Sequence, residues 1–117
     1  MLVGVDDDTV KWNADTPGIV QAQRGAGFGA TKVWFPWRPG MWHLGQTERH
    51  YVERLARMSL LRQRVVVAVN GRGAHPPRTA AARKQFCSYT REIMGSLPAV
   101  RDVVIRCRTQ IDNIRSE

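Results

Sequence analysis

Four short apolar runs, spaced by about thirty residues or slightly more, constrain the fold of this chain more than any other feature of its sequence. The runs are bounded by turn residues and read LVGV (2–5), KVWFPW (32–37), RVVVAV (64–69) and DVVI (102–105). Continuous apolar runs of this length are typical of strands that are buried on both faces, as in parallel sheets. We therefore predict four parallel strands.

Amphipathic stretches between these runs predict three helices. Asp15 or Thr16 is suited to cap the first helix, Thr47 the second and Thr79 the third, and apolar residues then recur at helical spacing. The resulting order is β-α-β-α-β-α-β, with right-handed crossovers expected between parallel strands. This order fits either an open doubly wound sheet or part of a (β/α) barrel.

The strongly basic composition does not point to a defined partner. The formal net charge is +8 and the isoelectric point is about 10.7. Fifteen of the eighteen basic residues are arginines, spread over positions 24–115 without a block of five or six like charges. We interpret this as a diffuse basic surface, and we do not expect a nucleic acid partner.

Cofactor, metal and membrane sites lack their usual signals. The glycines of RGAGFGATKV end a helix and precede a strand, the reverse of a dinucleotide loop. Cys87 and Cys107 belong to no C-x-x-C pair, so we predict no metal site and a buried free thiol at Cys87. No run approaches the ~18 apolar residues of a membrane span. Met1 is followed at once by the first apolar run, so we expect no signal peptide: the protein is cytoplasmic by default, or its start lies inside a longer reading frame.

Three consecutive aspartates, Asp6, Asp7 and Asp8, follow the first apolar run at the carboxyl end of the predicted strand. Ligands of parallel α/β folds bind at this edge of the sheet. Three carboxylates are able to hold a hard cation or to accept hydrogen bonds from sugar hydroxyls. Aspartate is also a common residue of turns and helix caps, and we favour this structural role over ligand binding.

Aromatic residues gather near the same predicted edge. Trp12 follows the first strand, and Trp34, Trp37 and Trp42 lie in or after the second. Indole rings are suited to stack on the apolar faces of sugars, although a tryptophan is also large enough to fill a core. The loops that leave the second and third strands add polar candidates, namely Arg38, Asn70, Arg72 and His75.

Taken together, GVDDDTVKW, ATKVWFPWRPG, RVVVAVNGRG, AARKQFCSY and VRDVVI resemble glycoside hydrolases of the large retaining TIM-barrel clan. The segments are most similar to bacterial, actinobacterial-type enzymes of the family-five, cellulase-like group. The resemblance implies a partial (β/α)8 TIM barrel, with strands one to four and three intervening helices. Residues 1–105 would form the N-terminal half of the barrel, and residues 106–117 a tail outside the family. Full-length relatives are expected to be secreted.

In that clan, strand four runs into Trp-Asn-Glu-Pro, whose glutamate is the general acid/base. This chain has Arg106, Cys107, Arg108 and Thr109 in those places, so Arg108 replaces the glutamate. An arginine does not donate a proton near neutral pH, and the retaining mechanism requires two carboxyl groups about 5–5.5 Å apart. The second belongs to strand seven, which 117 residues do not reach because a full barrel takes ~250. We therefore predict no catalytic residue, cofactor or metal.

The predicted function is a truncated glycoside hydrolase domain that acts on O-glycosidic bonds at the family level but is inactive as this chain. Its expected partner is a carbohydrate, and open barrel edges would also favour a homodimer. The alternative is a small non-catalytic α/β protein that binds carbohydrate or nucleic acid. The candidate substrate-binding residues are Asp6, Asp7, Trp34, Trp37, Arg38 and Asn70.

Overall fold

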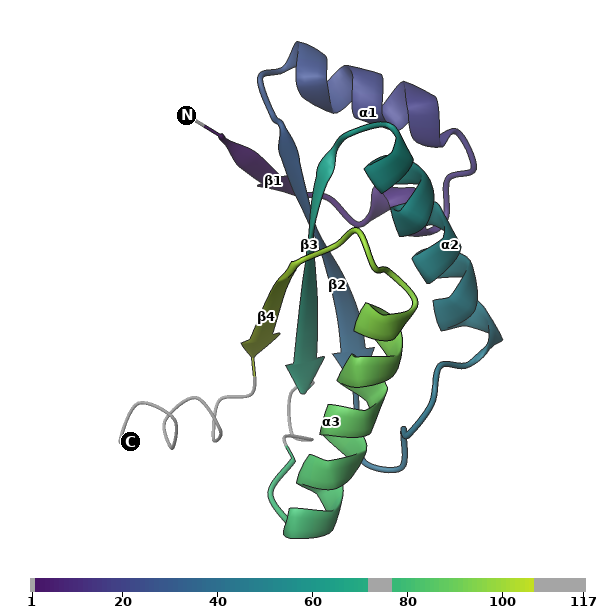
Figure 1. Ribbon diagram of the computed structural model, residues 1–117, viewed down its shortest axis with the longest axis vertical. Helices are drawn as coiled ribbons and strands as arrows, with labels where there is room; N and C mark the ends of the chain where they lie inside the picture. The colour runs from purple at the N-terminus through teal and green to yellow at the C-terminus, as the bar shows by residue number, and fades with distance from the viewer. Residues whose placement is uncertain (1, 72–76, 107–117) are drawn as a thin grey trace.

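Strands and helices alternate along the chain in the computed structural model, which describes residues 2–71 and 77–106 (Figure 1). The elements are β1 (Gly4–Asp6), the 3-10 turn η1 (Thr9–Lys11), α1 (Thr16–Gly25), β2 (Ala30–Trp37), α2 (Gln46–Leu60), β3 (Arg64–Gly71), α3 (Ala80–Gly95) and β4 (Asp102–Arg106). All four predicted strands and three predicted helices are present, and the strand ends differ from the predicted ones by at most two residues. The structure thus confirms the α/β class.

The four strands form one parallel sheet in the order β1-β2-β3-β4. Val33 of β2 lies beside Val67 of β3, which lies beside Val103 of β4. Each strand therefore pairs with the next one in sequence. A doubly wound sheet has a point at which the strand order reverses, and the described sheet has none.

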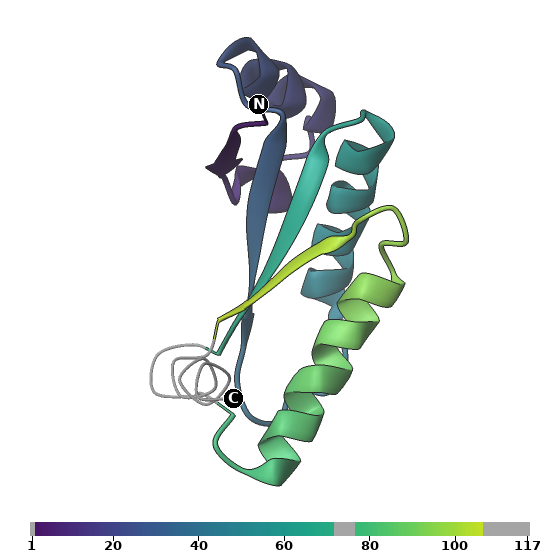
Figure 2. The same cartoon turned by 60° about the vertical axis from the view of Figure 1, so that its left-hand side comes forward.

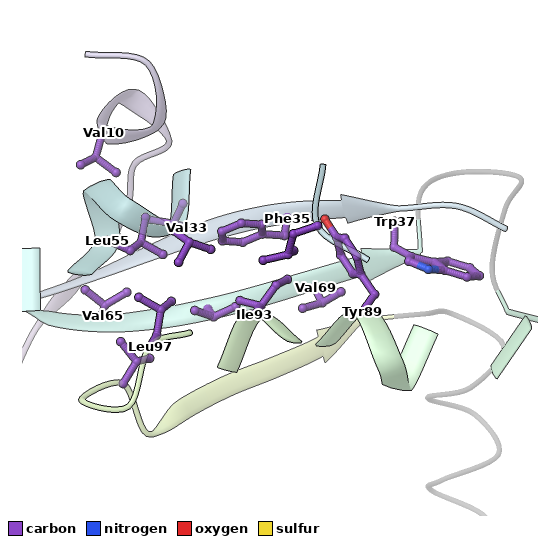
Figure 3. Packing of buried hydrophobic residues seen from close by; sticks show 14 of the residues in the cluster. Val10, Val33, Phe35, Trp37, Leu55, Val65, Val69, Tyr89, Ile93 and Leu97 are labelled. Atoms are coloured by element: carbon purple, nitrogen blue, oxygen red, sulfur yellow. The ribbon is translucent and has the colours of Figure 1, made fainter. Parts of the chain in front are cut away.

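All three helices pack on one face of this sheet (Figure 2). Side chains alternate between the two faces of a strand, and the core residues of β2 and β3 are accordingly every second one. Figure 3 shows Val33, Phe35, Trp37, Val65 and Val69 of the strands together with Leu55, Tyr89 and Ile93 of the helices. The buried cluster contains Val33, Phe35, Trp37, Val65, Val67 and Val69 from the strands, and Val20, Val52, Leu55, Met58, Ala82, Phe86, Tyr89 and Ile93 from the helices.

The alternate strand positions form a second surface, which no helix of the described part covers. We call it the helix-free face. Its strand positions, given by the register of the sheet, are Gly4, Asp6, Ala30, Lys32, Trp34, Pro36, Arg64, Val66, Ala68, Asn70, Asp102 and Val104.

The two caps predicted for α1 and α3 are confirmed. The side chains of Asp15 and Thr79 accept hydrogen bonds from backbone N–H groups in the first turns of these helices. The cap predicted at Thr47 is wrong, because α2 already includes this residue and its N-cap is Gly45. Glu48 provides the stabilising contact there: its Oε1 accepts the N–H of Gly45 at 2.9 Å.

A buried polar network closes the amino-terminal end of the core. Gln63 is 2% exposed, and its amide nitrogen lies 3.1–3.3 Å from three acceptors, on Phe28, Thr31 and Gln23. Its carbonyl oxygen accepts a hydrogen bond from Arg24 at 3.1 Å. The network joins α1, β2 and the turn between α2 and β3, and it satisfies polar groups that would be costly to bury alone.

Candidate functional site

The three consecutive aspartates diverge and do not converge on one point. Asp6 is exposed and lies 3.5 Å from the ammonium of Lys32. Asp7 accepts the backbone N–H of Thr9 at 3.0 Å and the amide of Gln23 at 2.9 Å. Burial raises the pKa of Asp7, but the hydrogen bonds from Thr9 and Gln23 outweigh this effect and leave the pKa below its usual value. Turn chemistry therefore accounts for Asp7.

Asp8 and Lys11 extend the pairing of β2 beyond the end of β1. The register of β1 with β2 stops at Lys32, and the next outward-facing backbone groups belong to Trp34. Asp8 accepts the N–H of Trp34 at 3.0 Å, and the ammonium of Lys11 donates to the carbonyl of Trp34 at 2.7 Å. Two positions later comes Pro36, which has no N–H to satisfy. Side chains thus replace the missing strand and fix the backbone at Trp34.

Sequence reasoning did not identify Lys11, although it is only 7% exposed. Besides its bond to β2, its ammonium lies 3.4 Å from the carboxylate of Asp8 and 5.0 Å from the ring centre of Tyr51. The i,i+3 spacing of Asp8 and Lys11 is the sequence feature that could have predicted their ion pair. This cluster ties η1, β2 and α2 together and has a structural role.

Trp37, predicted as a sugar-stacking residue, belongs instead to the core. It is fully buried on the helix-facing side of β2. Its indole N–H donates to the carbonyl of Met41 at 2.8 Å, and its ring meets Phe86 edge-on with 5.1 Å between ring centres. No surface of Trp37 is available to a ligand in this arrangement.

Trp34, which lies between the core residues Val33 and Phe35 of β2, is on the helix-free face and is partly exposed. The ammonium of Lys32 lies 5.1 Å from its ring centre. Asn70 of the neighbouring strand shares this face and is also partly exposed, and Arg38 is exposed immediately after β2. The structure thus brings Asp6, Trp34 and Asn70 to one face and leaves Arg38 at its carboxyl end.

The helix-free face is hollowed near β1. A shallow depression of about 490 Å³ lies beside the Asp6–Lys32 ion pair, and its floor includes Gly4, Ala30 and Val66. The depression thus combines the Asp6–Lys32 ion pair with an apolar floor, and Trp34 and Asn70 lie farther along the same face, outside its lining.

The carboxylates at strand positions of this face, within the described residues, are Asp6 on β1 and Asp102 on β4. Two strands separate them, so at about 4.8 Å per strand they are about 14 Å apart. This exceeds the carboxyl separations of both retaining and inverting glycosidases. Arg64 also engages Asp102 through two hydrogen bonds of 2.7 and 3.0 Å, which lower the pKa of Asp102. This pair does not have the geometry of an acid and a nucleophile.

A second polar cluster joins the β2–α2 connection to α3. Glu92 accepts the backbone N–H of Leu44 at 3.3 Å, and its other oxygen lies 2.9 Å from Nδ1 of His43. The contact with His43 lowers the pKa of Glu92, and Arg49, 3.8 Å away, acts in the same direction. The cluster is exposed at His43 and fastens the connection to the helix.

Cys87 is exposed, which corrects the expected buried thiol. Successive residues of a helix are about 100° apart, so Phe86 faces the core while its neighbour faces outward.

Arg72, His75, Cys107 and Arg108 lie outside the described residues. Within residues 2–71 and 77–106, no three His, Cys, Asp or Glu side chains form a group that could hold a metal ion. No helix of this part combines the length and apolarity needed to cross a membrane.

Comparison with known proteins does not assign the chain to a family. No family model matches it, and neither a curated protein nor a solved structure is significantly similar to it. The likeness to glycoside hydrolases therefore stays a prediction from the sequence, and the fold class rests on the structure itself.

Proposed function

We propose that this chain forms the first four strands of a glycosidase-like (β/α)8 barrel, and that it binds a carbohydrate at the carboxyl end of the helix-free face without hydrolysing it. The sheet order β1-β2-β3-β4 with all helices on one face supports the barrel, because a barrel adds strands in chain order with its helices outside.

The observation that carries the binding proposal is the grouping of Trp34, Asp6 and Asn70 on one face. The backbone of Trp34 is held on both sides, by β3 and by the Asp8 and Lys11 side chains. An indole on this anchored backbone, on the same face as carboxylate and amide groups, provides an apolar surface for a sugar ring together with acceptors and donors for its hydroxyls. The carboxylates of Asp6 and Asp102 lie about 14 Å apart. This spacing argues against hydrolysis.

Calorimetric titration with a soluble, uncharged β-glucan tests this function. The chain should bind it, and Trp34→Ala should weaken binding about tenfold or more. Trp12→Ala is the matched control: Trp12 is 64% exposed but follows η1 and occupies no strand position of the helix-free face, so its removal should leave binding unchanged. Equal losses in both variants, or no binding by the wild type, would contradict the proposal.

Two further measurements separate the alternatives. Release of reducing sugar from the glucan by the purified chain would contradict the non-catalytic assignment. Binding to duplex DNA that weakens steeply as salt rises, without glucan binding, would instead favour phosphate contacts by the basic surface.

A further inference from the structure

The outer strands of the sheet have a neighbour on one side only. β4 pairs with β3 and β1 pairs with β2, and no strand of the described part lies on their outer sides. In β4, Val103, Val104 and Ile105 are 40%, 38% and 43% exposed. A run patterned for burial on both faces is thus poorly covered on either, and such an edge is a template for another strand.

The β1 edge offers apolar surface in the complementary place. Leu2 and Val3, which lead into β1, are 53% and 45% exposed. On the helix side, a depression of about 290 Å³ opens between β1 and α1, with Val5 and Ile19 among its lining residues. A strand added next to β1 would place its helix-side residues beside this depression.

We propose that β4 pairs in parallel with β1 of a second copy of this chain, so that two copies close one eight-stranded sheet. The order β1-β2-β3-β4 then continues into the same order in the partner. Eight parallel strands are the number at which such a sheet closes with its interior filled by side chains.

A second copy fits these edges better than an isolated strand because it pairs both of them at once. All three helices lie on one face, so they remain outside the closed sheet, and Arg38 and Asn70 stay at its carboxyl rim. The inference rests on the barrel part of the proposed function and does not depend on sugar binding.

Sedimentation equilibrium of the full chain over a dilution series tests the pairing. The wild type should reach twice the 13.2 kDa mass of one chain. Val104→Lys on β4 and Val3→Lys before β1 should each weaken the dimer about tenfold or more while keeping the wild-type circular dichroism spectrum. Leu60→Lys, at a residue that is 83% exposed at the end of α2, is the matched control and should remain dimeric.

Mixing the two edge variants identifies which edges meet. The Val104→Lys copy keeps its β1 edge and the Val3→Lys copy keeps its β4 edge, so an equimolar mixture should recover dimers that neither forms alone. A monomeric wild type overturns the pairing, as does equal dissociation by Leu60→Lys. Failure of the mixture to recover dimers overturns the β4–β1 contact, and a Val3→Lys variant that stays dimeric on its own overturns it in favour of β4 meeting β4. A dimer without glucan binding would refute only the sugar-binding proposal, and a monomer that binds glucan only the pairing.

Discussion

β3 and β4 have similar apolar sequences but very different environments. In β3, Val67, Ala68 and Val69 are completely buried, whereas the three apolar residues of β4 are each about 40% exposed. β3 has a strand on both sides and helices above it, while β4 is the last strand of the sheet. An apolar run therefore indicates that a strand is suited to burial. Whether the strand is in fact buried depends on the strands and helices beside it.

The largest expected effect contrasts isoleucines in the two environments. Ile93 of α3 is fully buried, and Ile93→Ala should lower the free energy of unfolding by about 2–5 kcal/mol at every protein concentration. Ile105→Ala should cost less than about 1 kcal/mol in dilute solution, because Ile105 is 43% exposed, and more as the dimer forms. Urea unfolding over a dilution series measures both, and equal losses at the lowest concentration would break the comparison.

A smaller loss of stability is expected when the buried polar network of Gln63 is removed. Gln63→Leu should lower the free energy of unfolding by about 1–3 kcal/mol, because the carbonyl of Phe28 loses the bond from Gln63 and Nε of Arg24 loses its acceptor, while Arg24 keeps its bond to the carbonyl of Leu61. Gln21→Leu changes an exposed glutamine of α1 and should stay within about 0.5 kcal/mol of the wild type. Chemical denaturation measures both variants. Similar values for the two would mean that the polar network contributes nothing.

The smallest effect lies at the surface, where Glu92 contacts His43. The folded-state pKa of Glu92 is lowered, so its contribution to stability is present above the ordinary pKa of a glutamate and is lost as the pH falls through the folded-state value. The contribution should be below about 1 kcal/mol because the pair is solvent-exposed. Stability measured from about pH 7 to about pH 3 should therefore fall less steeply for Glu92→Gln than for the wild type.

His43→Ala provides the control for this pH effect. Removing His43 should have nearly the same effect as Glu92→Gln, and the double variant should add little to either change. Additive losses in the double variant would show that the two side chains act separately.

Most of the fold was predictable from the sequence because parallel strands and amphipathic helices have distinct apolar patterns. Residue type predicted the cap at Thr79 and narrowed the cap of α1 to Asp15 or Thr16, of which the structure uses Asp15. The cap predicted at Thr47 was wrong, because Gly45 and Glu48 form a competing arrangement two residues earlier. Residue type alone does not show at which of several nearby residues the backbone begins a helix.

The candidate site was predictable only in part. The sequence placed Trp34 and Trp37 near the same edge, but alternation along β2 sends the first to the helix-free face and the second into the core. The roles of Asp8 and Lys11 depend on β1 being shorter than β2, which follows from pairing and not from either segment alone. Tertiary contacts, and not local preference, decide such residues.

The neighbour-to-neighbour order of the strands has a consequence for how the polypeptide is made. Every strand joins the one synthesised just before it, so each βαβ unit is complete once its second strand has left the ribosome. Each strand therefore pairs with a strand that is already synthesised. The entropy cost of closing the loop between the two stays small because few residues separate them. Within the described part of the chain, β4 is the strand added last, and its outer edge stays exposed until another strand pairs with it.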